Sequence, residues 1–300
     1  MKRQDLVGYG SGFMTGVFWA ISGVFGQFLF EQRGIVPAWL VPIRLISSGV
    51  LLFTYLLLTE KRAELLSLPK CRRDFLHVIA AGVFGTMPAQ AAFFYAVNAS
   101  NAATATVLQY VAPVFILLIV CVRSRRRPTG VELLAIVLAV GGIFLIATHG
   151  DIHTLVMTTG GLLWGFANAG GMVLNSVLPE GLYRKYSTQV VMAWAFLFGG
   201  AALALLTKPW QYEVRWNGEM LLAMFVIVVI GSVAAFGLYA VSVKLVGSSR
   251  ASLVATSEPV AATVLSVAFL GTSFAAVDLI GFAMILSIAF ILTLTKKTEV

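Results

Sequence analysis

Ten apolar runs, each long enough to cross a lipid bilayer as a helix, follow one another along this 300-residue chain. A spanning helix needs about 20 mostly apolar residues, because each residue advances it by about 1.5 Å through a hydrocarbon core about 30 Å thick. Only 11% of the residues are charged, whereas ordinary soluble domains carry about 25%. The sequence therefore predicts an all-α membrane protein whose surface faces lipid. We expect ten transmembrane helices, at residues 6–30, 37–59, 76–97, 102–122, 130–148, 157–177, 187–207, 219–240, 251–270 and 275–295.

Lysine and arginine are shared unevenly between the two sets of loops. If the N-terminus is cytoplasmic, 17 of the 21 fall on the inner side, three (Arg33, Lys208 and Arg215) fall on the outer side, and Arg44 lies within a span. Cytoplasmic loops of membrane proteins carry an excess of Lys and Arg. We therefore expect both termini in the cytoplasm and a place in the cell (plasma) membrane, as a bacterial inner-membrane protein. The net charge of +8 follows from this orientation, so no nucleic-acid partner is expected.

Three short motifs recur at a nearly constant distance along the chain. "GVFWA" (16–20) matches "GLLWG" (161–165) at an offset of 145, while "ATVLQYVAPV" (105–114) matches "ASLVATSEPV" (251–260) at an offset of 146. "VELL" (131–134) matches "VDLI" (277–280), again at 146. The offset predicts two five-helix repeats, residues 1–150 and 151–300. Because five is odd, the second repeat enters the membrane in the opposite sense, and such inverted repeats are an architecture of secondary transporters.

These features resemble the drug/metabolite transporter superfamily, EamA type. The resemblance rests on the two five-helix repeats, a proline in spans 4 and 9, the pair "EP" (258–259), and an arginine early in span 2 ("PIRLISSG", 42–49). It implies an EamA-like repeat in each half, and a secondary transporter that moves small metabolites by alternating access, such as an exporter of amino acids or related compounds. It also implies a central substrate cavity between the repeats. Small multidrug transporters use a glutamate in their first span, and this chain has none there.

Bulky and amide side chains on the expected inner faces are the candidates for the cavity wall. Trp19 and Trp164 are related by the repeat and lie among small residues, so they either border a space or pack against helices. An amide in the lipid core needs a hydrogen-bond partner, which points Gln90, Gln109 and Asn168 inward. The sequence leaves open whether these three amides meet substrate or another helix.

Arg44 and Glu258 are the two charged side chains expected deep in spans. Arg44 lies about 10 Å below the outer surface, counted at about 1.5 Å per residue. It either snorkels to that surface or attracts a substrate carboxylate. Glu258 lies at a similar depth from the cytoplasmic side, so we do not expect the two to pair directly. Glu258 is interpreted either as a site for a coupling proton or cation, or as a structural carboxyl.

Pro113 and Pro259 occupy equivalent places in spans 4 and 9. A proline lacks the backbone N–H that a helix uses and can kink the helix. Pro259 frees a carbonyl one turn earlier, near Ala255. Irregular backbone at membrane depth is tolerated where it faces protein or a water-filled cavity, so both kinks are expected inside the bundle.

Other functions and partners are expected to be absent. "HGDIH" (149–153) offers His149, Asp151 and His153, but we expect a solvated loop there and no metal site. We expect no cofactor and no catalytic residues. The alternatives to a transporter are a membrane-embedded enzyme and a structural or regulatory membrane protein. The expected partners are a small-molecule substrate and the lipid bilayer, and the chain is expected to be a monomer or a weak dimer.

Overall fold

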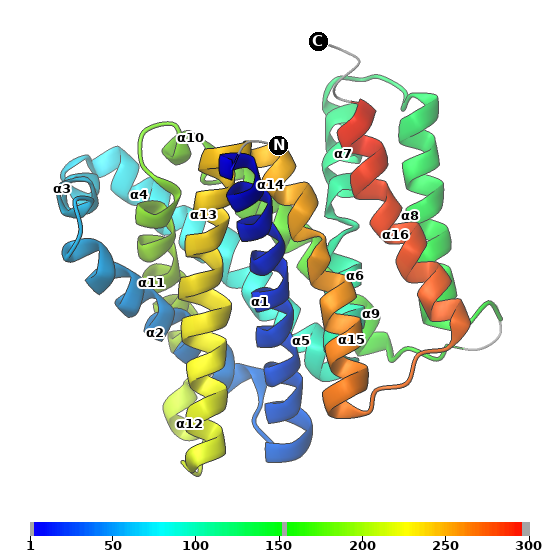
Figure 1. Cartoon of the computed structure of the whole chain (residues 1–300), viewed down its shortest axis with the longest axis horizontal. Helices are drawn as coiled ribbons and strands as arrows, with labels where there is room; N and C mark the ends of the chain where they lie inside the picture. The colour runs from blue at the N-terminus through cyan, green and yellow to red at the C-terminus, as the bar shows by residue number, and fades with distance from the viewer. Residues whose placement is uncertain (1–2, 152–154, 296–300) are drawn as a thin grey trace.

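The computed structural model of the chain describes residues 3–151 and 155–295, which form helices and no strand (Figure 1). Within these ranges, nine helices are long and apolar enough to cross a membrane, and Ala276–Leu292 is a shorter apolar helix. The predicted all-α membrane fold is thereby confirmed. The helices are α1 (Arg3–Arg33), α2 (Pro37–Leu57), α3 (Arg62–Ser67), α4 (Arg72–Ala81), α5 (Met87–Ala99), α6 (Ala102–Gln109), α7 (Ala112–Arg123), α8 (Gly130–Thr148), α9 (Thr159–Val177), α10 (Glu180–Tyr183), α11 (Thr188–Thr207), α12 (Gly218–Phe225), α13 (Ala235–Val246), α14 (Ser248–Ala255), α15 (Ser257–Leu270) and α16 (Ala276–Thr295).

Spans 4 and 9 are each broken shortly before their proline. Span 4 consists of α6 and α7 and breaks at Tyr110 and Val111, while span 9 consists of α14 and α15 and breaks at Thr256. Pro113 and Pro259 lie in the first turn of the second piece, where a missing N–H costs least. Tyr110 and Thr256 are 146 residues apart (256 − 110), so the two breaks recur at the offset of the sequence repeat.

Spans 3 and 8 are interrupted by π-helical segments. The segment η2 (Gly82–Thr86) joins α4 to α5, and η4 (Val226–Ala234) joins α12 to α13. A shift of 146 places Gly82 at position 228, inside η4. The irregular stretches of the second half therefore repeat those of the first.

The bundle has two ends, each tied together by polar contacts. At one end, Lys185 Nζ donates a hydrogen bond to Asp74 Oδ1 at 2.8 Å. We call this the basic end, because the Lys- and Arg-rich loops lie there. At the opposite end, Arg33 forms an ion pair with Glu219. Both α1 begins and α16 ends at the basic end (Figure 1), which is what an even number of crossings requires.

The helices of one half pack mainly on helices of the other. The most extensive contacts are those of α2 with α11, α5 with α9, α8 with α16, and α1 with α13. In terms of spans these pairs are 2 with 7, 3 with 6, 5 with 10, and 1 with 8. If each span is replaced by its counterpart in the other half (1 by 6, 2 by 7 and so on), the same four pairs result. Figure 1 shows α8 and α16 side by side at one edge of the molecule.

Candidate functional site

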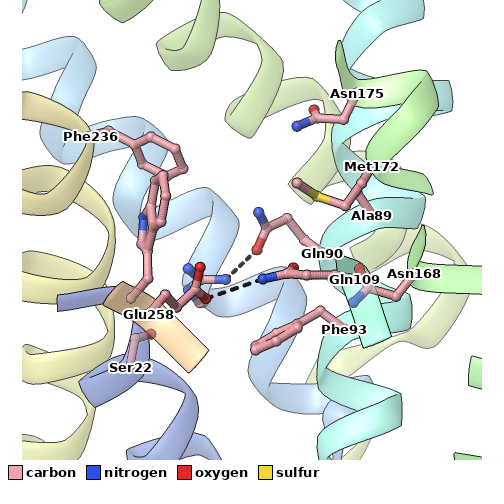
Figure 2. A pocket seen from close by; sticks show the side chains of 12 residues that line it. Ser22, Ala89, Gln90, Phe93, Gln109, Asn168, Met172, Asn175, Phe236 and Glu258 are labelled. Carbon is pink, nitrogen blue, oxygen red and sulfur yellow. Dashed lines mark hydrogen bonds between the residues drawn. The ribbon is translucent and has the colours of Figure 1, made fainter. Parts of the chain in front are cut away.

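A cavity of about 600 Å³, counting the part that is open to solvent, lies within the bundle (Figure 2). Its wall combines polar, charged and aromatic side chains from both halves of the chain, on α1, α2, α5, α6, α9, α13 and α15. The lining residues are Trp19, Ser22, Arg44, Ala89, Gln90, Phe93, Gln109, Asn168, Met172, Asn175, Phe236 and Glu258.

Arg44 lies in the wall of this cavity and is 5% exposed. Its Nη1 donates a hydrogen bond to Gln90 Oε1 at 2.5 Å. The guanidinium carbon lies 4.9 Å from the centre of the Phe94 ring, in cation–π geometry. The side chain therefore turns inward on α2 instead of snorkelling to the membrane surface.

Glu258 is also buried in the cavity wall, at 6% exposed. Its Oε1 accepts a hydrogen bond from Gln109 Nε2 at 3.3 Å. Among the described residues, no ion pair joins Glu258 to Arg44. Figure 2 shows the hydrogen bond between Gln109 and Glu258 as a dashed line, whereas Arg44 is bonded to Gln90. A glutamine of the first half thus holds each of the two ionisable groups.

The backbone break before Glu258 is closed by a tyrosine from the other half. Pro259 has no N–H to offer the carbonyl of Ala255, and Tyr110 Oη donates to that oxygen at 3.4 Å. A Cβ added at Gly16 on α1 would lie 2.6 Å from the same oxygen, so only glycine lets α1 approach the break so closely. Neither Pro113 nor Pro259 lines the cavity; both act through the backbone.

Several polar atoms of the wall are buried without a hydrogen-bond partner among the described residues. They are Trp19 Nε1, Ser22 Oγ, Arg44 Nε and both amide atoms of Asn168. Trp19 also packs its ring against Phe236, at 5.3 Å between centroids, and against Tyr239, at 5.7 Å. Unsatisfied buried groups are rare in folded proteins, and five of the eight such side-chain atoms among the described residues belong to the wall of this cavity.

Trp164 does not line the cavity, although its repeat partner Trp19 does. Its ring stacks on Tyr95 with centroids 4.6 Å apart and planes at 19°, and it is 39% exposed. Of the two interpretations given for Trp164, packing against a neighbouring helix therefore holds, and bordering a cavity does not. Conversely, Phe236 lines the cavity and carried no polar signal in the sequence. It is the repeat counterpart of Gln90 (236 − 90 = 146), so the offset could have located it.

The cavity is sealed unequally towards the two ends of the bundle. Towards the opposite end lies an apolar cluster that includes Phe30, Trp39, Leu40 and Phe94, contributed by α1, α2 and α5 together with α6, α11 and α12. Towards the basic end, the wall residues Met172 and Asn175 of α9 are partly exposed.

The "HGDIH" loop makes a contact that does not involve a metal. His149 Nε2 lies 2.9 Å from Asp278 Oδ1, joining the end of α8 to the start of α16. His153 lies outside the described residues. Within residues 3–151 and 155–295, no group of three or more His, Cys, Asp or Glu side chains could hold a metal ion.

Comparison with known proteins places this architecture in a family. The model of the EamA-like transporter family matches residues 6–148 and, a second time, residues 159–294. The chain belongs to the EamA-like transporter family. The resemblance inferred from the motifs is thereby confirmed, with one family match in each half. Membership of a transporter family favours transport over the alternatives of a membrane enzyme or a structural protein.

Two relatives carry similar descriptions. The "Uncharacterized inner membrane transporter YicL" of Salmonella typhimurium is 33% identical over 284 residues, which is 95% of this chain and 94% of that protein. An "Uncharacterized transporter" of Archaeoglobus fulgidus is 27% identical over 224 residues, covering 73% of this chain and 78% of that one. A crystal structure of a protein with 19% identity has a TM-score of 0.63 and covers 97% of this chain and 98% of its own. At 19% identity, this similarity shows a shared fold alone.

Proposed function

We propose that this EamA-family protein is a secondary transporter that exports amino acids or related small metabolites by alternating access. The observation that carries the proposal is that buried Arg44 and buried Glu258 lie in the wall of the same cavity. An amino acid is a zwitterion, whose carboxylate suits a guanidinium and whose ammonium suits a carboxylate. A net-neutral solute also brings no net charge into the buried cavity, whereas an unpaired ion buried there would be costly.

The proposal includes two inverted repeats, residues 1–150 and 151–300. Support comes from the two family matches, the helix breaks at equivalent positions and the set of helix pairs that is unchanged when the halves are exchanged. Two cavity residues are related in the same way, since Gln90 and Phe236 are 146 residues apart (236 − 90). Repeats of this kind provide two states of similar energy, one open to each side of the membrane.

The basic end is assigned to the cytoplasm by the excess of Lys and Arg in its loops. Both termini are then cytoplasmic, in a bacterial inner membrane. The apolar cluster around Phe94 closes the cavity on the outer side, and the partly exposed Met172 and Asn175 of α9 lie towards the cytoplasm. This arrangement corresponds to an inward-facing state, from which an exporter loads its substrate. One chain lines the whole cavity, so a monomer suffices for transport.

Glu258 is the proposed coupling group, with a purely structural carboxyl as the alternative. Burial removes hydration and disfavours its charged form, while Gln109 and the charge of Arg44 in the same wall favour it. A group held in such balance can exchange a proton when access to the cavity changes. Glu258→Gln keeps the size of the side chain but cannot titrate. The variant is expected to lose the dependence of transport on a pH gradient when each protein is saturated with substrate; full retention of that dependence makes Glu258 structural.

Transport by the purified protein in proteoliposomes tests the proposed function. Liposomes loaded with unlabelled amino acid should accumulate radiolabelled amino acid by exchange, and empty liposomes should not. A panel of net-neutral, acidic and basic amino acids, together with sugars, identifies the class. Exchange of net-neutral amino acids by the wild type, reduced at least tenfold by Arg44→Gln, supports the proposal. Exchange of none of the amino acids refutes it.

A further inference from the structure

We propose that Asn168 is a specificity-determining residue that recognises a hydrogen-bond donor beside an acceptor on the substrate, the pattern of a primary carboxamide. The preferred solute is then an amino acid with a carboxamide side chain. This inference rests on the proposed function, because it concerns the part of the substrate beyond its zwitterionic group.

Asn168 differs from the other amide side chains near the cavity. Gln90 accepts from Arg44, Gln109 donates to Glu258, and Asn175 accepts from Thr86 at 2.9 Å. Asn168 is 0% exposed, and neither Oδ1 nor Nδ2 has a partner among the described residues. Its amide thus retains both a donor and an acceptor beside the space that a substrate enters.

The backbone that carries Asn168 is fixed on both sides. Three residues earlier, a Cβ added at Gly165 would lie 2.4 Å from Leu108 Cδ1 on α6. Three residues later, a Cβ added at Gly171 would lie 2.7 Å from the Cα of Ala89 on α5. These close contacts lock α9 against α5 and α6, so the helix cannot rotate to turn the amide of Asn168 towards lipid.

The charged groups and Asn168 come from different sides of the cavity. Figure 2 shows Glu258 on one side and Asn168 on the other, with Gln90 and Gln109 between them. A substrate whose zwitterionic group is held by Arg44 and Glu258 extends its side chain from these groups across the cavity. The far end of the substrate side chain is then the part that can form hydrogen bonds with Asn168.

The chemistry of the free amide ranks the possible side chains. A carboxamide donates to Oδ1 and accepts from Nδ2, so it satisfies both atoms at once. A carboxylate satisfies only Nδ2 and places like partial charges against Oδ1. An aliphatic chain satisfies neither and leaves the buried amide unpaired, and sites with unpaired polar groups discriminate strongly. For two hydrogen bonds of ordinary net strength we expect a preference of about 10- to 100-fold.

The test is competition by glutamine, glutamate and norleucine for exchange in proteoliposomes. For the wild type, the half-inhibiting concentration of glutamine is expected to be about 10- to 100-fold below that of norleucine, and below that of glutamate. Asn168→Leu replaces the amide by an apolar group of similar size and should abolish the advantage of glutamine over norleucine. Asn168→Ala, which adds no bulk, should do the same if the leucine variant does not fold.

Ser266→Ala is the matched control. Ser266 is likewise buried at 0% exposure with an unpartnered hydroxyl among the described residues, but it does not line the cavity. The control should keep the ratio of glutamine to norleucine. Equal inhibition by the two in the wild type, or an unchanged ratio in both Asn168 variants, overturns the inference while leaving amino-acid transport standing. Absence of exchange for every amino acid instead refutes the proposed function itself.

Discussion

Gly16 on α1 is the position where a single methyl group tests the packing around the Glu258 break. A Cβ there would lie 2.2 Å from Ser257 Oγ, 2.6 Å from Ala255 O and 2.8 Å from the backbone N of Glu258. Ordinary Cβ contacts begin at 3.4 Å, so α1 and the backbone of the break must separate by about 0.8 Å (3.4 − 2.6). Overpacking of this kind typically costs about 1–3 kcal/mol.

Gly10 on the same helix provides the control, because a Cβ added there meets nothing within 4 Å. Both Gly→Ala changes gain about 1 kcal/mol of helix propensity, so the difference between the two variants isolates the clash. We expect Gly16→Ala to unfold about 2–10 °C below Gly10→Ala in detergent, measured by tryptophan fluorescence on heating. We also expect its transport rate to fall at least tenfold, because the displaced break carries Glu258. Equal unfolding temperatures for the two variants would falsify the packing argument.

Three further changes probe the wall of the cavity. Arg44→Lys keeps the positive charge but loses the planar guanidinium that reaches Gln90. The half-saturating concentration of a carboxylate-bearing substrate should therefore rise about tenfold, with little change in the maximal transport rate. An unchanged half-saturating concentration would show that Arg44 does not contact substrate. Tyr110→Phe removes the hydroxyl that donates to the Ala255 carbonyl and should lower the free energy of unfolding by about 1 kcal/mol, measured by thermal unfolding. An unchanged stability would mean that water replaces this hydrogen bond without loss. Trp164 stacks on Tyr95 outside the cavity, so Trp164→Leu should leave the half-saturating substrate concentration unchanged in transport assays. A severalfold increase in that concentration would indicate that Trp164 does contact the substrate.

Much of the fold follows from the sequence, because lipid admits few alternatives. A chain with long apolar runs must satisfy its backbone within helices, so run length and loop charge predict the spans and their order. The breaks in spans 4 and 9 follow from Pro113 and Pro259. The π-helical segments η2 and η4 were not predicted. Pro88 follows η2 closely and has no N–H to offer the carbonyl of Phe84, whereas no proline lies in or beside η4.

The site was accessible to sequence reasoning only where a side chain was chemically out of place. Arg44 and Glu258 in apolar spans had to be buried against something, and both lie in the cavity wall. Phe236 looks like any apolar span residue, so nothing local distinguishes it from a lipid-facing one. Trp164 shares the small-residue surroundings of Trp19, yet Tyr95 stacks on it. Rotation of a helix by a fraction of a turn decides such cases, and rotation depends on tertiary contacts.

Accessibility of one cavity residue from each side of the membrane tests the central claim most directly. In a background without Cys71 and Cys121, Met172→Cys places a thiol in the cavity wall, and Val264→Cys, at a position 60% exposed on α15, serves as a lipid-facing control. Alternating access predicts that a charged, membrane-impermeant maleimide labels position 172 from either side of the membrane. When a transported amino acid is added, the labelling rates from the two sides should change in opposite directions. Position 264 should remain unlabelled. Labelling of position 172 from one side only, whatever solute is present, would contradict the claim that this cavity opens in turn to both sides.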